Sequence, residues 1–266
     1  MYNCIMKNNK ILISQKIKKP YFSVITVVKN DEKNISLTLR SIKNQTFRNF
    51  EYLVIDGAST DSTINKIFKF KSNIHYLLSE KDRGIYFAMN KGLKLCRGQV
   101  VLFLNSGDTL TRNALKIVRQ KFKKKEIDFV FGTVKRHYTK NTILKYGFNL
   151  NKLKYNFDFA TSHSSGFFLK RKIYNKLRYF DTKYQCSADY DIYLKAIMRM
   201  RLKGEATKKT DLIGIVKAGG FSSKFGFFKH LIEECKIRIN NNQNIFFVIA
   251  ILVNDILKKT IKKILN

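Results

Sequence analysis

The first half of the chain alternates short apolar runs with segments of helical periodicity. Its first run, YFSVITVV at 21–28, is β-branched and unbroken, which is typical of a parallel strand buried on both faces. In the segment that follows, Ile35, Leu39 and Ile42 recur at helical spacing. Repeated alternation of this kind indicates a doubly wound, mainly parallel sheet with right-handed crossovers and flanking helices. We therefore expect an α/β fold over residues 21–124.

The other elements of this half keep the same rhythm, since each apolar run is followed by a helical segment. Strands are predicted at 50–56, 74–80 and 99–104, and helices from within 59–63, at 84–96 and near 112–124.

Beyond residue 125 the regular alternation gives way to a mixture. Apolar runs typical of strands lie at 127–138, 143–148, 165–170 and 212–217, and a helix is predicted at about 188–200. This mixture predicts a mixed or antiparallel extension of the same sheet, which would carry the second substrate. The expected organisation is an N-terminal extension over 1–20, a domain over 21–223 with halves at 21–124 and 125–223, and a basic amphipathic helical tail over 224–266.

The chain is strongly basic, with 52 Lys and Arg against 19 Asp and Glu and a formal net charge of +33. Such a field attracts polyanions, which include nucleic acid, anionic lipid and phosphorylated substrates. Lysine and asparagine are abundant throughout, so the charge alone does not choose among these classes. No recognised nucleic-acid motif appears in the sequence, and a nucleic-acid-binding protein is therefore the least favoured alternative.

Cysteine usage and hydropathy predict a protein that stays in the cytoplasm. The four cysteines are scattered without a CxxC pair, as expected of reduced thiols in a cytosolic protein. The run ILIS at 11–14 is too short for the core of a signal peptide, and no apolar run approaches the roughly 20 residues that a membrane-spanning helix needs.

Acidic and small polar residues stand at the carboxyl ends of the predicted strands, in VIDGASTDST at 54–63, SEKDRGIYFAMNKG at 79–92 and VVLFLNSGD at 100–108. Ligands of open α/β sheets bind at this edge, so the three blocks predict one pocket for a charged, hydroxyl-rich ligand. Asp56 ends a strand and can accept a hydrogen bond from a base imide or a ribose hydroxyl. Asp61 is better placed to cap the helix that follows.

Two other acidic sites are candidates for chemistry. Asp108 closes a tight polar turn, where a carboxylate can hold Mg²⁺ or Mn²⁺ with diphosphate oxygens completing the shell, although Asn and Gly can also serve such a turn by backbone geometry alone. In SADYDIYLKAI at 187–197, Asp189 and Asp191 lie about 200° apart on a helix, so they cannot both face one ligand. An acid in a first turn can also be present for the helix dipole alone.

In these blocks the chain resembles the family 2 inverting glycosyltransferases of the GT-A fold, especially the branch that acts in bacterial surface-polysaccharide synthesis. The resemblance covers roughly residues 21–223 and keeps the order of the family's motifs. The matching blocks are SVITVVKN, SIKNQTFRNFEYLVIDGASTDST, SEKDRGIYFAMNKG, GQVVLFLNSGD, HSSGFF, FDTKY, ADYD and GGFSS.

The resemblance implies a role for each candidate residue. Asp56 would bind the nucleobase, and Asp82 and Arg83 would make charged contacts in the nucleotide pocket, where a guanidinium suits a base or a phosphate. Asp108 matches the metal-binding aspartate at the end of the family's DXD-like motif. Asp189 takes the place of the general base, the second acid of the "ED" motif.

Three positions depart from the family pattern. The metal motif reads Asn105-Ser106-Gly107-Asp108 with one carboxylate, which implies modest metal affinity, and Ala188 replaces the usual Glu beside the base. His163 occupies the "HQ"-like position near the acceptor, but Ser164 replaces the usual Gln, and a core or backbone-bonded His163 remains an equal alternative. Because these motifs carry fewer acidic residues than the family pattern, an alternative interpretation remains. The chain would then be a catalytically weak, membrane-attached scaffold with the GT-A fold.

The implied reaction is a single displacement by a nucleotide-sugar-dependent transferase of the hexosyltransferase type. The donor would be a nucleotide diphosphate sugar, with UDP-sugar favoured, and Mg²⁺ or Mn²⁺ at Asp108 would offset charge on the leaving diphosphate. Asp189 would take the proton of the attacking acceptor hydroxyl, so the anomeric configuration would invert. The resemblance implies a glycan or a polyprenyl-diphosphate-linked sugar as the acceptor.

The C-terminal segment 244–266 has its own pattern. It is apolar from Ile245 to Val253, and then lysines at 258, 259, 262 and 263 alternate with apolar residues. This profile predicts an interfacial helix on an anionic membrane, which would place the protein peripherally on the inner face of the plasma membrane. The alternative is a terminal helix that packs on the domain with its lysines in solvent.

Overall fold

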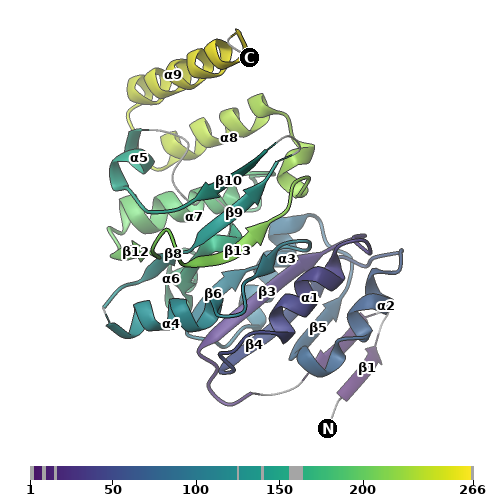
Figure 1. The fold of residues 1–266 in the computed structure, drawn as a ribbon. Helices are drawn as coiled ribbons and strands as arrows, with labels where there is room; N and C mark the ends of the chain where they lie inside the picture. Colours follow the sequence, from purple (N-terminus) through teal and green to yellow (C-terminus); the bar gives the residue numbers. More distant parts are fainter. Residues whose placement is uncertain are drawn as a thin grey trace.

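The structure is a computed structural model that describes residues 3–7, 10–14, 17–124, 126–138, 141–155 and 164–264. A nine-stranded sheet runs through the molecule, and a smaller four-stranded sheet lies next to it (Figure 1). In spatial order the large sheet contains β1 (Asn3–Lys7), β2 (Lys10–Ser14), β5 (Tyr76–Ser79), β4 (Phe50–Asp56), β3 (Phe22–Val28), β6 (Val100–Phe103), β11 (Phe167–Lys170), β8 (Phe129–Phe131) and β12 (Gly204–Ala206). The small sheet contains β10 (Thr142–Lys145), β9 (Thr133–His137), β13 (Leu212–Val216) and β7 (Thr109–Leu110).

The centre of the large sheet is the parallel unit that the sequence predicts. Strands β5, β4, β3 and β6 are neighbours and all three pairs are parallel. They are connected through α1 (Ile35–Lys43), α2 (Thr63–Phe68) and α3 (Ile85–Leu95). The chain builds outward from β3 to β5 and then returns to place β6 on the other side of β3. The strand order therefore reverses between β3 and β6, where an α/β sheet leaves a crevice for a ligand.

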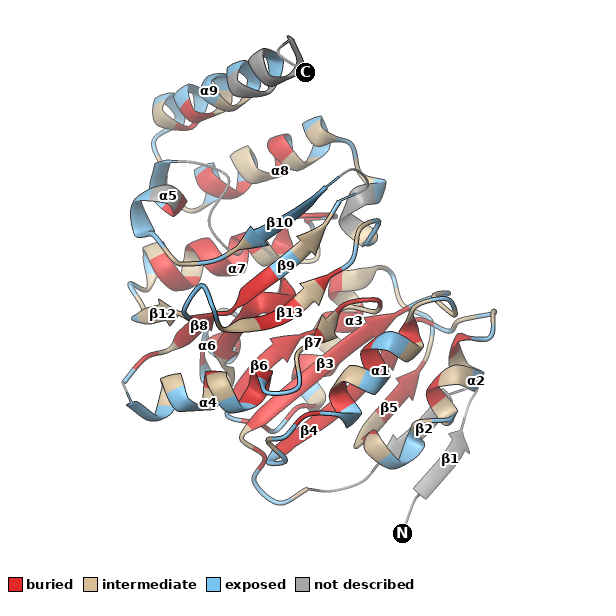
Figure 2. Ribbon diagram, viewed as in Figure 1, coloured by how far each residue is buried: buried red, intermediate tan, exposed pale blue. Residues whose placement is uncertain are grey.

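Both faces of this parallel unit are covered, which explains its unbroken apolar runs. In β3, Ile25 and Val27 belong to the core cluster on the α3 side, whereas Val24 and Val28 belong to the cluster on the α1 side. The four strands are accordingly buried along almost their whole length (Figure 2). The α/β fold expected for residues 21–124 is confirmed.

The second half is mixed, as expected, but one predicted strand divides in two. The run 127–138 forms β8 in the large sheet and β9 in the small sheet, with Gly132 between them. A Cβ at Gly132 would lie only 2.9 Å from Cγ1 of Ile213, so the missing side chain lets Ile213 pack closely where the chain passes from one sheet to the other. Strand β11 is antiparallel to both β6 and β8, and it joins the two halves.

The amino-terminal segment, expected as an extension ahead of the fold, adds strands to the sheet. Strands β1 and β2 form an antiparallel pair, and β2 pairs antiparallel with β5 from Ile11–Ser79 to Ser14–Tyr76. This pair continues the sheet beyond the edge of the parallel unit. Among the described residues, no helix has the length and apolar character needed to span a membrane.

The remaining helices surround the second half. They are α4 (Ala114–Lys124), α5 (Leu150–Tyr155), α6 (Arg171–Lys176), α7 (Ala188–Leu194) with a π-helical turn (Lys195–Arg199), α8 (Phe227–Asn240) and α9 (Ile245–Ile264). Short 3₁₀ turns lie at Lys71–Asn73, before β5, and at Ser164–Gly166 and Phe221–Lys224.

The C-terminal tail consists of two helices that pack on the domain. Helix α8 contacts α7, and α9 contacts α8 (Figure 1). Leu231 and Ile237 of α8 and Ile251 of α9 are buried in the core cluster that includes α3 and α7. The inner side of these two helices therefore packs on the domain, as in the alternative to a membrane-bound helix that the sequence analysis left open.

Candidate active site

A cleft of about 1200 Å³ opens where β3 and β6 end, at the reversal of strand order. Its walls come from both halves of the chain, because the lining includes the start of α3, the turn after β6, the start of α7 and one side of α8. Five basic side chains line it, Lys29, Arg83, Arg136, Lys217 and Lys224. Six acidic side chains also line it, Asp31, Asp82, Asp108, Asp189, Glu234 and Asp255, so the charge of the cleft is mixed. Its basic groups can contact an anionic ligand.

Asp108 lies at the base of the turn after β6 and is 4% exposed. Its carboxylate accepts hydrogen bonds from the Ser165 hydroxyl and, at 2.9 Å, from the backbone N–H of Lys217. Burial raises the pKa of Asp108 to about 7, although these hydrogen bonds and the charge of Arg136 act in the opposite direction. The carboxylate is thus held from two later segments of the chain.

A second carboxylate, Asp31, lines the cleft near this turn, and the sequence analysis did not assign it to the site. Its Oδ2 accepts a hydrogen bond of 2.6 Å from Ser106 Oγ, and its Oδ1 accepts one of 2.5 Å from Asn34 Nδ2. The same Asn34 accepts a hydrogen bond from the Lys217 ammonium group. The sequence contained a signal for this residue, because Asp31 follows β3 just as the other acidic residues follow their strands.

The oxygen atoms around this turn fit a hard divalent cation in part. Asn105 donates from Nδ2 to Ser164 Oγ at 3.1 Å, while its buried Oδ1 has no hydrogen-bond partner among the described residues. Oxygen ligands from Asn105, Asp108 and Asp31 are of the type that Mg²⁺ and Mn²⁺ prefer. The described residues contain no group of three His, Cys, Asp or Glu able to hold a metal. A cation here would therefore need further oxygen ligands, from water or from a diphosphate.

Asp189 is the second residue of α7 and lines the cleft, where it is half-buried. Its Oδ1 accepts hydrogen bonds from the backbone N–H of Tyr190 at 3.0 Å and from the Tyr86 hydroxyl at 3.4 Å. Burial raises the pKa of Asp189 to about 6, and the hydrogen bonds and the nearby charge of His230 limit the rise. An ionised Asp189 at neutral pH can accept a proton.

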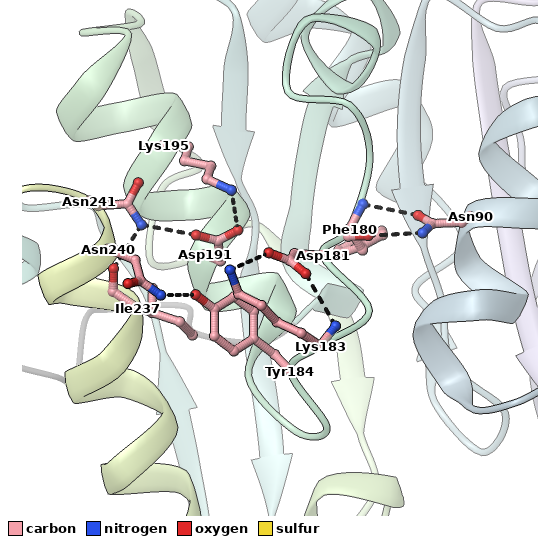
Figure 3. A network of polar contacts seen from close by, with 10 residues as sticks. All are labelled: Asn90, Phe180, Asp181, Lys183, Tyr184, Asp191, Lys195, Ile237, Asn240 and Asn241. Atoms are coloured by element: carbon pink, nitrogen blue, oxygen red, sulfur yellow. Dashed lines mark hydrogen bonds and ion pairs between the residues drawn. The ribbon is translucent and has the colours of Figure 1, made fainter.

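Asp191 is not among the described residues that line the cleft, and its side chain points toward Lys195 and Asn241 (Figure 3). It is 1% exposed, forms an ion pair of 2.6 Å with Lys195 and accepts a hydrogen bond of 2.9 Å from Asn241 Nδ2. The structure therefore places Asp189 in the cleft and Asp191 outside it. This agrees with the helical spacing, which prevents both residues from facing one ligand.

Asp82 and Arg83 line the cleft from the loop before α3. Asp82 Oδ1 accepts a hydrogen bond of 3.0 Å from the backbone N–H of Gly84, and the exposed Arg83 guanidinium lies 5.5 Å from the ring centre of Phe87. A Cβ at Gly57 would lie 2.8 Å from Asp82 Oδ2, so the end of β4 passes directly beside this loop.

Asp56 occupies a different environment from the one expected of a base-binding residue. It is 0% exposed and is not among the described residues that line the cleft. Its oxygens accept hydrogen bonds from Ser59 N at 2.9 Å, Ser59 Oγ at 2.5 Å and Ser79 Oγ at 2.6 Å. These contacts tie the ends of β4 and β5 together, and base binding by Asp56 stays a prediction. His163, the expected acceptor-side residue, lies outside the described residues.

Helix α8 contributes a wall that the sequence analysis missed. Phe227, His230, Leu231 and Glu234 line the cleft, and His230 Nδ1 lies 3.4 Å from Ser187 Oγ. These residues were assigned to a tail because no familiar motif covers them. Their recurrence at helical spacing was the available signal.

A profile of the family described as Glycosyl transferase family 2 matches residues 23–187, more than half of the chain. The chain belongs to glycosyl transferase family 2. A PGL/p-HBAD biosynthesis glycosyltransferase of Mycobacterium bovis is 29% identical to this family 2 enzyme over 187 residues, which cover 66% of this chain and 69% of the relative. The Escherichia coli protein WfgD, named UDP-Glc:alpha-D-GlcNAc-diphosphoundecaprenol beta-1,3-glucosyltransferase, is 35% identical over 111 residues, 41% of this chain and 44% of its own.

Solved structures share the fold of this glycosyltransferase. S. aureus TarS 1-349 in complex with UDP-GlcNAc aligns with a TM-score of 0.68 and 20% identity, covering 87% of this chain and 70% of that one. The mannosyltransferase PcManGT from Pyrobaculum calidifontis, in complex with GDP-Man and Mn²⁺, aligns with a TM-score of 0.63 and 19% identity, covering 90% and 69%. The GT-A fold expected from the sequence is confirmed, and the protein is a nucleotide-sugar-dependent glycosyltransferase.

Proposed function

We propose that this enzyme is an inverting glycosyltransferase that moves a sugar from a UDP-sugar to a hydroxyl group of a glycan or lipid-linked acceptor in cell-surface polysaccharide synthesis. The observation that carries the proposal is that Asp108 and Asp189, from opposite halves of the chain, line one cleft together with five basic side chains. WfgD, by its name, uses UDP-Glc and a diphosphoundecaprenol-linked acceptor, and TarS binds UDP-GlcNAc. Both names support the choice of donor, and the first supports the choice of acceptor.

The donor lies, in this proposal, against the carboxyl ends of the parallel strands. Arg83, Arg136 and Lys217 face the diphosphate, and their charges favour its binding in a partly enclosed cleft. Mg²⁺ or Mn²⁺, held by Asp108 and Asn105 together with diphosphate oxygens, would offset the negative charge that develops on the leaving group.

Asp189 acts as the general base. Its carboxylate takes the proton of the acceptor hydroxyl while that oxygen forms a bond to the anomeric carbon. The bond between the anomeric carbon and the diphosphate oxygen breaks, and the diphosphate leaves with the electron pair. One displacement from the opposite face inverts the anomeric configuration, and no covalent sugar–enzyme bond forms.

A donor screen tests the proposal. Purified protein is mixed with UDP- and GDP-sugars and Mg²⁺ or Mn²⁺, and donor binding, nucleotide release and transfer are measured for wild type, Asp108→Asn and Asp189→Asn. We expect turnover in wild type only. Absence of both donor binding and turnover would remove the proposal, and full transfer by Asp189→Asn would remove the assignment of the base. A donor that binds without turnover would indicate the scaffold alternative.

We further propose that the outer side of the C-terminal helices rests on the anionic inner face of the plasma membrane. Phe246, Ile249, Val253 and Leu257 recur at helical spacing along α9 and are all exposed, Phe246 to 78%. Phe228 and Ile232 of α8 are also exposed. An apolar stripe on a protein of net charge +33 has the two properties that an interfacial helix needs, and it would bring the cleft near a lipid-linked acceptor.

A further inference from the structure

Glu233 of α8 is a nearly buried carboxylate that makes an unusual set of contacts. It is 9% exposed, and its Oε1 accepts a hydrogen bond of 2.8 Å from the backbone N–H of Gln185. Its Oε2 accepts hydrogen bonds from the N–H of Cys186 at 2.9 Å and of Ser187 at 3.1 Å, and from the Cys186 thiol at 3.2 Å. One side chain thus satisfies three consecutive backbone donors of the loop that enters α7.

These contacts are stronger than ordinary turn hydrogen bonds. Burial alone would raise the pKa of Glu233, but the hydrogen bonds from the three amides and the thiol outweigh it, and the pKa lies below its usual range. Glu233 is therefore ionised at neutral pH, and hydrogen bonds to an ionised acceptor are about twice as strong as those between neutral groups. Without it, three buried or half-buried N–H groups would have to find other acceptors.

The loop held by Glu233 leads directly to Asp189. Ser187 precedes the first residue of α7, and Asp189 is the second, so the direction in which the loop enters the helix fixes where the Asp189 side chain points. The intervening Ala188 is fully buried and supplies no polar group. The side-chain hydrogen bonds that hold this turn therefore come from α8.

Helix α8 also holds the segments on either side of this loop. Asn240 donates from Nδ2 to the Tyr184 hydroxyl at 2.9 Å, and Asn241 donates from Nδ2 to Asp191 at 2.9 Å (Figure 3). Residues 184–191 are thus tied to one helix before, at and after the loop. The Asp189 carboxylate belongs to a segment that is hydrogen-bonded to α8 and its C-cap Asn241 at several points.

We propose that Glu233 is a positioning residue for the general base: from α8 it fixes residues 185–187 and thereby directs Asp189 into the cleft. The inference rests on the proposed function, because it acts through Asp189. The residues proposed to contact the donor, Arg83, Asn105, Asp108, Arg136 and Lys217, lie on other segments, so we expect donor binding not to depend on Glu233.

The test compares Glu233→Gln with Glu205→Gln, which removes a half-exposed carboxylate on β12 that is paired with Lys121. Glutamine keeps the shape but turns an NH₂ group toward backbone donors. Loss of one or two charge-assisted hydrogen bonds predicts amide hydrogen exchange at 185–187 that is about 10- to 100-fold faster. We expect kcat to fall by a similar factor while donor Kd and the exchange of other segments stay unchanged. Glu205→Gln should behave as wild type.

Glu233→Asp serves as the second variant, because it keeps the charge and shortens the reach. We expect intermediate values for both exchange and kcat, so it remains informative if Glu233→Gln does not fold. Unchanged exchange at 185–187 would overturn the inference, and so would faster exchange with unchanged kcat, or a fall in donor affinity that matches the fall in kcat. If wild type neither binds nor consumes a donor, the proposed function fails, while the exchange comparison still decides whether Glu233 holds the loop.

Discussion

Asp108 and Asp189 both lie in the cleft, and burial raises the pKa of both, to about 7 and about 6. Their proposed roles require both to be ionised, one to hold a cation and the other to accept a proton. A bound cation favours the ionised form of its ligand, so donor and metal binding would lower the pKa of Asp108. Asp189 then remains the group whose titration limits turnover in the saturated complex.

The pH dependence of kcat should therefore report Asp189. We expect kcat to be constant above pH 7 and to fall about tenfold per unit at pH values well below 6, because only the ionised carboxylate accepts a proton. The positive charge of His230 lowers the pKa of Asp189, so His230→Gln should move this fall to higher pH. The measurement is kcat at saturating substrates from pH 5 to 8.

His137→Gln, on β9, is the control and should leave the profile in place. A profile of His230→Gln that coincides with that of wild type would contradict the electrostatic coupling of His230 to Asp189.

Asp56 allows a structural role to be separated from base binding. Asp56→Asn would place an NH₂ group among the donors of Ser59 and Ser79, so we expect a loss of about 1–3 kcal/mol in the free energy of unfolding, measured in urea without ligand. Asp128→Asn, which removes a half-exposed ion pair with Lys170, should change it by less than about 1 kcal/mol. Unchanged stability with lost donor affinity would support base binding alone.

Residue positions at the site were predictable where a strand end or a family motif marks them. Asp82, Arg83, Asp108 and Asp189 all line the cleft, and the roles that the sequence assigns to them stay predictions. The burial of Asp56 was not predictable, because one of its partners, Ser79, ends β5 and meets it only in the folded chain, although the other, Ser59, lies three residues away. His230 and Glu233 were missed for the same reason, since their partners lie more than 40 residues earlier.

At the scale of elements, hydrophobic periodicity located the parallel strands and their helices because each element carries its burial pattern within its own residues. The small sheet was not foreseen. Its strand β13 pairs in parallel with β9 and antiparallel with β7, so it depends on segments far apart in the chain. Periodicity identifies a strand but not its partner, and the division of 127–138 follows from partners that it does not reveal.

The packing of β3 on the segment before β6 depends on Gly98. A Cβ there would lie 2.5 Å from backbone atoms of Phe22 and Ser23, which cannot move aside as a flexible side chain can. We expect Gly98→Ala to lower the free energy of unfolding by about 1–3 kcal/mol or more, measured by urea denaturation. Gly226→Ala is the control, because no described atom lies within 4 Å of its Cβ and its φ is −68°. Equal stabilities would contradict the close approach.

Membrane binding is best tested on the outer stripe of α9. Removal of the whole helix would also remove Val248 and Ile251, which are buried against the domain. We expect Phe246→Ser with Ile249→Ser to reduce sedimentation with anionic vesicles about tenfold or more, since each large apolar side chain contributes about 1.5–3 kcal/mol when fully buried. Leu37→Ser, at an exposed position on α1, should leave sedimentation unchanged. Equal binding by all three proteins would remove the membrane proposal.

At the scale of the whole molecule, the cleft joins two halves that contribute different groups. The parallel half supplies Arg83, Asn105 and Asp108, whereas the second half supplies Lys217, Asp189 and the wall of α8. A ligand that touches both halves should stabilise the entire fold and not a single segment.

Donor and metal should therefore raise the melting temperature together. At a concentration 100 times its Kd, a ligand stabilises the folded state by about 2.7 kcal/mol, which for a domain of this size corresponds to roughly 5–10 °C. We expect this shift with UDP-sugar and Mn²⁺, a much smaller one after EDTA, and a reduced one in Asp108→Asn, all measured by thermal unfolding. An undiminished shift in EDTA would show that the basic side chains alone hold the diphosphate.

The hydrogen bond from the Lys217 N–H to Asp108 spans 109 residues of sequence. On the ribosome, the parallel half emerges first, and at about 5–20 residues per second the strand that completes the environment of Asp108 follows roughly 5–20 s later. Glu233 and His230 emerge later still. A nascent chain can therefore form its parallel half before it can catalyse transfer, so nucleotide sugars in the cell meet an active enzyme only after residues 217–233 have also emerged.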